Sequence, residues 1–221
     1  MRGDEAGAPA RPRAAIEWVA LQDGWTEARV YVTNEERKAA LRAQAQQEID
    51  ALAQAGVRMA GNGFSPIVLV KGELNEEEAA GGDLLAGADG RALRAALTAV
   101  GWAPEDFCAL ASVAGDGNGV AGEPGSVLPA ALFREALEQL DPEAVVLLDD
   151  AASHEMREAY ADALVSMESF DAAMLQPGLV VPVLGRRVLA LDGFERALAD
   201  KREKQRMWAY LKQLAPLGAP Y

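Results

Sequence analysis

A polar loop directly follows a short apolar run in the first half of this sequence. Ile67-Val68-Leu69-Val70 is uninterrupted and partly β-branched, which is typical of a strand buried on both faces of a parallel sheet. From Lys71 the chain becomes polar, with glutamates at positions 73, 76, 77 and 78. Carboxylates in such a loop can position water or exchange protons, and open α/β sheets place their sites at the carboxyl ends of strands. We therefore expect this loop to contribute to a site.

Two adjacent aspartates, Asp149 and Asp150, follow a second apolar run at 144–148. Paired carboxylates at a strand end can bind a metal ion or act as an acid and a base. The simpler interpretation, which we favour, is that Asp150 caps the helix that follows and Asp149 is solvated. The single histidine, His154, lies within that helix. Histidine metal clusters and serine–histidine triads are therefore poorly supported.

Residues 114–125 are rich in glycine and include Asp116 and Asn118. A phosphate-binding loop would end in Gly-Lys-Ser/Thr, and this segment lacks both that ending and the spacing of a dinucleotide-binding turn. A calcium loop would need a full series of ligands ending in a glutamate. We interpret the segment as a flexible connection.

The composition is ordinary for a soluble globular protein. The chain has 221 residues, a net charge of −13 and a single cysteine, Cys108, which excludes an internal disulfide and cysteine-based zinc or four-cysteine iron–sulfur sites. No apolar run approaches the roughly 18 residues that span a bilayer, and the N-terminus lacks the apolar core of a secretory signal. We expect a disordered tail over 1–13, one domain over 14–221, a cytoplasmic location, no membrane partner and no cofactor.

The negative charge would repel nucleic acid over much of the surface, because affinity for phosphates comes largely from Lys and Arg. One stretch differs, since residues 186–206 contain seven basic and four acidic side chains. Such runs are usually solvated helix faces with mixed ion pairs. The alternative is a local basic face near Arg186–Arg206 that binds nucleic acid. A basic protein is the other candidate partner, and the oligomeric state is not predicted.

Alternating apolar runs and amphipathic segments position these residues. We expect helices at about 34–56, 91–100, 129–140 and 151–164, and buried strands at 67–70, 107–113, 144–148 and 187–191. Residues 14–32 are expected to pack on the domain as an extension. A continuous last helix over 194–214 is expected to bury Phe194, Ala197, Leu198, Trp208 and Leu211. Strands that alternate with helices predict an α/β fold, a three-layer sandwich with a mostly parallel sheet of about four strands.

Several sequence motifs occur in a characteristic order. They are the strand and Gly-Glu loop of 68–75, the segment 87–90 before an amphipathic helix, Leu97-Thr98-Ala99-Val100-Gly101-Trp102, the helix, proline and strand of 133–148, and a last strand followed by a helix with Trp208 and Leu211. Over roughly residues 35–215 this order resembles the uracil-DNA glycosylase superfamily, most closely its microbial iron–sulfur branch. The resemblance implies a glycosylase-like fold and a reaction on a flipped uracil. The four cysteines of that branch are absent here.

The family mechanism can be compared with this chain position by position. The family stacks the base on an aromatic ring, reads it with an asparagine, positions water with a carboxylate in a Gly-Glu-Ala-Pro-Gly loop, and stabilises the departing base with the histidine of a His-Pro-Ser loop. Here the stacking position is Leu85, the asparagine position is Ala111, and the histidine loop is 192–194. An ungapped alignment puts Gly72 at the carboxylate position, whereas a one-residue slip puts Glu73 there. The resemblance therefore implies the fold without the family's efficient reaction.

Three functions remain open from the sequence. The first is a non-catalytic, glycosylase-like protein that binds another macromolecule, its loop glutamates being either solvated or arranged like the phosphates of DNA. The second is a divergent DNA glycosylase that uses Glu73 or Asn75 together with Asp192. Its base pocket would be walled by Leu85, Ala111 and Phe194. The third is a small-molecule α/β enzyme in which the paired aspartates carry the chemistry.

Overall fold

The computed structural model describes residues 17–21, 24–28, 33–103 and 107–218. The chain divides into two compact units, residues 1–47 and 48–221. The tail expected over 1–13 lies outside the described residues, and a single domain over 14–221 stays a prediction. All candidate site residues lie in the second unit.

The first unit contains a β-hairpin and most of a long helix. β1 (Glu17–Leu21) pairs antiparallel with β2 (Gly24–Ala28), and α1 runs from Asn34 to Gln54. Thr33 and Glu36 begin this helix with a capping box, because the side chain of each accepts a hydrogen bond from the backbone N–H of the other. The predicted helix is thus confirmed. The packing expected for 14–32 concerns side chains that lie outside the described part.

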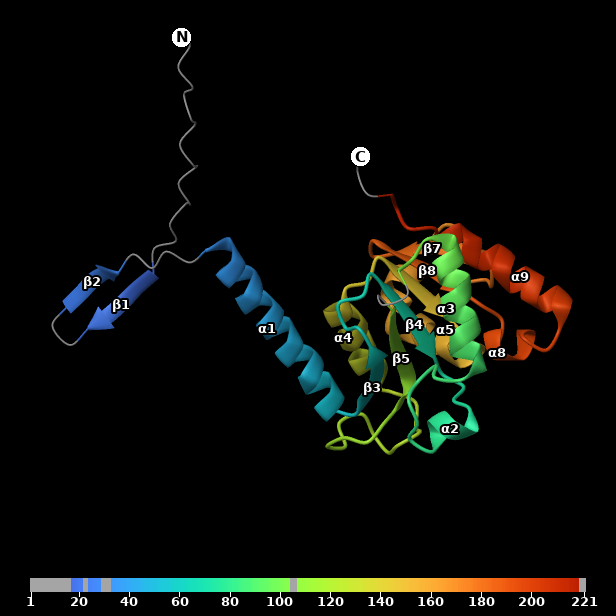
Figure 1. Cartoon of the computed structure of the whole chain (residues 1–221), viewed down its shortest axis with the longest axis horizontal. Helices are drawn as coiled ribbons and strands as arrows, with labels where there is room; N and C mark the ends of the chain where they lie inside the picture. Colours follow the sequence, from blue (N-terminus) through green and yellow to red (C-terminus); the bar gives the residue numbers. More distant parts are fainter. Residues whose placement is uncertain (1–16, 22–23, 29–32, 104–106, 219–221) are drawn as a thin grey trace, which may run out of the picture. The chain divides into compact units, whose positions relative to one another are not determined.

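The second unit is built on a six-stranded mixed sheet with the order β3-β5-β4-β6-β8-β7 (Figure 1). The inner strands, all parallel, are β5 (Phe107–Ala114), β4 (Ile67–Lys71), β6 (Ala144–Leu147) and β8 (Arg186–Ala190). The edge strands, both antiparallel to their neighbours, are β3 (Val57–Gly61) and β7 (Val180–Val183). The α/β class is confirmed. The sheet is larger than the four strands expected because β3 and β7 pair with its edges.

Helices cover both faces of this sheet and make three layers. The longer ones are α3 (Ala88–Val100), α4 (Ala130–Leu140), α5 (Asp150–Ala159) and α9 (Lys201–Leu211). The single-turn ones are α2 (Glu76–Ala79), α6 (Ala161–Leu164), α7 (Phe170–Ala173) and α8 (Phe194–Ala197). α4 and α5 pack with Val68 and Val70 on one face, whereas α3, α8 and α9 pack with Ile67 and Leu69 on the other. β4 is therefore buried on both faces, as its apolar run predicts.

The last helix differs from the single helix expected over 194–214. α8 ends at Ala197, and α9 begins after Asp200, whose carboxylate caps it by accepting from two backbone N–H groups. A 3₁₀ turn over Lys212–Leu214 follows. Phe194 and Ala197 are buried, as expected, but Trp208 is 37% exposed. Because the chain breaks between α8 and α9, the turns of α9 do not continue the spacing of α8. The prediction that Trp208 is buried is therefore wrong.

Two other segments differ from expectation in local detail. The helix expected over 151–164 is divided at Tyr160 into α5 and α6, and Pro129 is the N-cap of α4 rather than its first residue. The glycine-rich loop is anchored to the end of α1 by its backbone. The N–H groups of Gly115 and Asn118 donate to the carbonyl oxygens of Gly56 and Gln54. The composition of the loop therefore suggests more freedom than its hydrogen bonds allow.

Candidate functional site

The sheet has a topological switch point between β4 and β6. α3 connects β4 to β5 on one face, whereas α4 connects β5 to β6 on the other. In open α/β sheets, ligands bind outside the carboxyl ends of the strands at such a point. Lys71 ends β4 here, and Leu148 and Asp149 follow β6. The crevice between these residues is therefore the candidate site.

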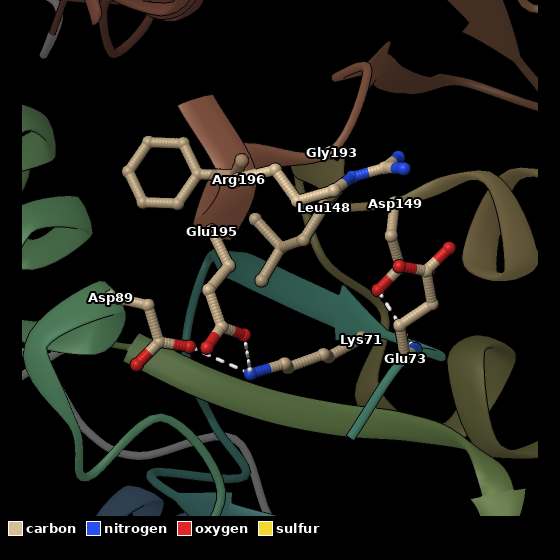
Figure 2. Close-up of a pocket in the computed structure, with 9 residues that line it drawn as sticks. Lys71, Glu73, Asp89, Leu148, Asp149, Gly193, Glu195 and Arg196 are labelled. Carbon is tan, nitrogen blue, oxygen red and sulfur yellow. Dashed lines mark hydrogen bonds and ion pairs between the residues drawn. The ribbon is translucent and has the colours of Figure 1, made fainter. Parts of the chain in front are cut away.

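Lys71 is the centre of a buried cluster of charges in this crevice (Figure 2). Its Nζ lies 2.7 Å from Oε2 of Glu78, 2.7 Å from Oδ2 of Asp89 and 3.0 Å from Oε2 of Glu195. The side chains of Lys71, Glu78 and Asp89 are 4% exposed or less, whereas that of Glu195 is half exposed. The carboxylates come from α2, α3 and α8. This Lys71 cluster therefore joins three elements to the end of β4.

Opposing effects act on the pKa of Lys71. Burial by itself lowers the pKa, but hydrogen bonds to the three carboxylates outweigh burial and hold it above the ordinary 10.5. Burial likewise raises the pKa of Asp89, but the hydrogen bond from Lys71 holds that pKa below the ordinary 3.8. Lys71 is therefore protonated at neutral pH. It offers neither a base nor an amine nucleophile to a substrate.

Backbone groups fix the position of Glu78. With Asn75 it forms a capping box, in which each side chain accepts from the other's backbone N–H at 2.9 Å. Its second carboxylate oxygen accepts from the N–H of Leu85 at 2.8 Å. Arg58 of β3 holds the same segment by donating to the carbonyl oxygens of Glu78 and Gly82. Both oxygens of this carboxylate are therefore occupied within the protein.

Asp149 ties the loop after β4 to the start of α5. Its carboxylate accepts from the N–H of Ala152 at 2.8 Å, as the N-cap of α5, and from the N–H groups of Gly72 and Glu73 at 2.9 and 3.0 Å. Asp149 is 4% exposed, whereas Asp150 is exposed. The prediction that Asp150 is the cap and Asp149 is solvated is wrong. Asp149 has the extended backbone that an N-cap needs, and Asp150 is already the first residue of the helix.

A small cavity lies between these groups and the start of α8. Its lining includes Lys71, Glu73, Asp89, Asp149, Phe194 and Arg196 (Figure 2). Its volume is about 20 Å³, which is room for a single water molecule and far too little for a nucleobase. The protein's own side chains therefore fill the crevice at the switch point.

The three residues predicted for catalysis lie in separate places. Glu73 is exposed and lines the small cavity. Asn75 caps α2 and lines a different hollow, on the side of α2 and α3. Asp192 is exposed, lies 3.5 Å from Arg206, and lines a third hollow beside α5. The structure does not bring these three side chains into one site.

The three residues predicted to wall a base pocket lie in the hydrophobic core. Leu85, Ala111 and Phe194 are 1%, 0% and 4% exposed and belong to one cluster, on the face that α3 and α9 cover. Leu85 has a φ of 55°, and a Cβ added to Gly90 would lie 1.7 Å from the carbonyl oxygen of Leu85. Phe194 also lines the one-water cavity. The residues are therefore brought together, but as core packing around a closed crevice.

A larger hollow of about 730 Å³ lies between the α2 segment and the end of β5. Its volume is suited to a small ligand. Its walls are mostly small residues and backbone at 79–81 and 113–116, and its charged side chains are Arg58 and Asp116. Arg58 already donates to two carbonyl oxygens. The hollow thus offers few polar groups that could select or activate a substrate.

The sequence reasoning missed Lys71 and Asp89, and it grouped Glu78 with the solvated or phosphate-like loop glutamates, although the side chain of Glu78 is 2% exposed. The available signal is the position of Lys71, directly after four residues of a strand that is buried on both faces. An ammonium group in such a place needs carboxylate partners, because burying an unpaired charge is costly. This cost could have identified Lys71 as a paired lysine, but not which carboxylates pair with it.

Within the described ranges, no group of three or more His, Cys, Asp or Glu residues is placed to hold a metal ion. No helix described there is long and apolar enough to cross a membrane. A scan against models of protein families finds no match to this chain, and a search of curated proteins finds none either.

Proposed function

We propose that this chain is a uracil-DNA glycosylase-like protein that lacks efficient base excision and acts by binding another macromolecule. The observation that carries the proposal is the closed crevice at the switch point. Lys71 and its carboxylates fill the place where a ligand would enter, and the remaining cavity holds about one water. A flipped base would have no space there unless the buried cluster were first broken.

The chemistry around the crevice supports the same proposal. Excision of uracil leaves negative charge on the departing base, and groups aimed at such charge commonly supply several kcal/mol. At the position of the family's histidine loop, Asp192 lines a separate hollow and brings no hydrogen-bond donor to that charge. Leu85 has no aromatic face on which to stack a base. Binding, rather than bond cleavage, is therefore the better interpretation.

One observation favours the alternative, a divergent glycosylase that hydrolyses the N-glycosidic bond of a flipped uracil or damaged base. Glu73 is an exposed carboxylate at the edge of a cavity that can hold one water. A carboxylate beside a water is what such hydrolysis needs. This alternative requires the crevice to open on binding DNA, at the cost of separating Lys71 from its partners.

The decisive experiment is an excision assay with excess protein on single- and double-stranded oligonucleotides that contain uracil. Abasic sites would be detected as strand breaks after alkaline treatment. We expect no strand breaks above background. Breaks that disappear in Glu73→Gln but persist in Glu76→Gln, a change at an exposed position at the start of α2, would overturn the proposal in favour of the divergent glycosylase.

A further inference from the structure

The arginines of the basic stretch are mostly neutralised by carboxylates. Nη2 of Arg186 lies 3.0 Å from Asp141, and Nη2 of Arg187 lies 2.5 Å from Glu143. Arg206 lies 2.5 Å from Glu203. These three side chains therefore offer little charge to a partner, and the other exposed basic groups of the stretch are Arg196, Arg202 and the lysines of the last helix.

The outer face of α9 carries unpaired charge. It consists of Lys201, Lys204, Trp208 and Lys212, which succeed one another at spacings of three or four residues and so lie along one side of the helix. All four are exposed, whereas Met207 and Leu211, on the adjoining side of the helix, are buried. In the described part of the chain no carboxylate lies within ion-pair distance of these lysines.

This concentration of lysine is unusual for the chain. The sequence contains five lysines, and three of them lie on the α9 outer face, while Lys71 is buried in its own cluster. The chain as a whole has a net charge of −13. A polyanion would therefore be repelled by much of the surface and attracted here, which favours binding at this face.

An exposed indole lies among these charges. Trp208 is 37% exposed, and Nζ of Lys212 lies 5.9 Å from the centre of its ring. Aromatic rings beside basic groups bind single strands, because bases stack on the ring while phosphates pair with the cations. A lipid surface is disfavoured, since the apolar side of α9 is already buried in the core and cannot enter a membrane.

From these observations we propose that the α9 outer face binds single-stranded nucleic acid, with a base stacked on Trp208 and phosphates paired with the three lysines. The last lysine lies eleven positions after the first, about 16 Å along a helix, which is long enough to contact a few consecutive nucleotides. The inference rests on the proposed binding function and names the class of its partner. It places the partner on α9, away from the closed crevice.

The test is fluorescence anisotropy of a labelled 20-nucleotide oligodeoxythymidine, titrated with the full chain at about 50 mM salt. We expect saturable binding that weakens with salt, and a loss of about ten-fold or more in the Lys201→Glu, Lys204→Glu, Lys212→Glu triple variant. Trp208→Ala should lose about five-fold or more at unchanged charge. The matched control is Arg37→Glu, Lys38→Glu, Arg42→Glu, which makes the same charge change on exposed positions of α1 and should lose much less.

Each other outcome overturns the inference. The inference is contradicted if the unmodified chain does not bind the oligonucleotide, if the α9 variant binds as well as the unmodified chain, or if the α1 and α9 variants lose equal affinity. Binding to phosphatidylserine vesicles without binding to the oligonucleotide would also contradict it. Thermal unfolding of every variant checks that the fold is intact. Excision of uracil would overturn the proposed function and leave the α9 site standing. Absence of both excision and oligonucleotide binding would leave a binding protein with a different partner.

Discussion

Nζ of Lys71 lies 2.7 Å from Oδ2 of Asp89, and both side chains are almost completely buried. The pair joins the end of β4 to the first turn of α3, the helix that follows it in the chain. Their charges are satisfied within the protein, so the crevice presents no free ammonium or carboxylate from either of them. Five predictions follow from this arrangement and from its surroundings.

Lys71→Met should lower the free energy of unfolding by about 3–5 kcal/mol at pH 7, because it leaves Glu78 and Asp89 buried without a cation. Urea denaturation followed by circular dichroism measures this change. Lys38→Met is the control, since Lys38 is exposed and its pair with Glu35 is worth at most about 1 kcal/mol. Equal effects of the two changes would contradict the structural role of the cluster.

The same variant has a predicted pH dependence. The pKa of Asp89 is lowered, so its stabilisation is complete above the ordinary 3.8 and is lost as pH falls through the lowered value. The pKa of Lys71 is raised, so its stabilisation is complete below the ordinary 10.5 and is lost as pH rises through the raised value. The stability difference between the unmodified chain and Lys71→Met should therefore be largest between about pH 5 and 10 and shrink in acid.

Asp149→Ala should cost at least about 1–2 kcal/mol, because α5 loses its N-cap and the loop after β4 loses its acceptor. Asp150→Ala should stay within about 0.5 kcal/mol, since that side chain is exposed. Chemical denaturation of the two variants side by side checks this. The reverse order of the two losses would show that the neighbouring aspartate is the cap.

Glu155→Gln should stabilise the protein at neutral pH and not in acid. Burial raises the pKa of Glu155, and Oε1 has no hydrogen-bond partner among the described residues. The folded state therefore binds this proton more tightly than the unfolded chain, and stability falls as pH rises from the ordinary 4.5 to the raised value. Melting temperatures at pH 4 and pH 7.5 test this, with the exposed Glu135→Gln as the control. A gain as large at pH 4 as at pH 7.5 would contradict it.

Leu85→Phe should not create a base-stacking site. The position is filled by core packing, so the larger ring should cost about 1–3 kcal/mol, while the exposed Leu217→Phe stays within about 0.5 kcal/mol. Thermal unfolding measures the cost, and the excision assay is run on the same sample. Uracil excision gained by a stable Leu85→Phe protein would mean that the crevice opens more easily than its packing indicates.

The sequence predicts the local elements well where one physical signal dominates. The apolar run at 67–70 indicates β4 correctly, and Thr33 with Glu36 marks the start of α1. The orientation of Trp208 could not be predicted, because a continuous helix from Phe194 would place both on the same buried side. The chain breaks between α8 and α9, and Asp200 caps the new helix, so Trp208 no longer follows the helical spacing that begins at Phe194.

The site is less accessible to sequence reasoning than the elements. The partners of Lys71 come from positions 78, 89 and 195, and no local pattern connects positions so far apart in the chain. The choice between Asp149 and Asp150 depends on a one-residue difference in where the helix begins. Helix ends cannot be fixed that closely from residue types.

Pro182 lies in the middle of β7, at one edge of the sheet. In the strand register, Pro182 lies opposite Arg187 of β8. The N–H of Arg187 donates to the carbonyl oxygen of Glu143, toward β6 and away from β7. The backbone N and C=O of Pro182 therefore point the other way, toward the open edge of the sheet. Proline has no N–H, and another strand approaching there would find a donor missing from the middle of the edge. The sheet is thus protected on this side against extension by a second molecule, which limits aggregation through edge-to-edge pairing.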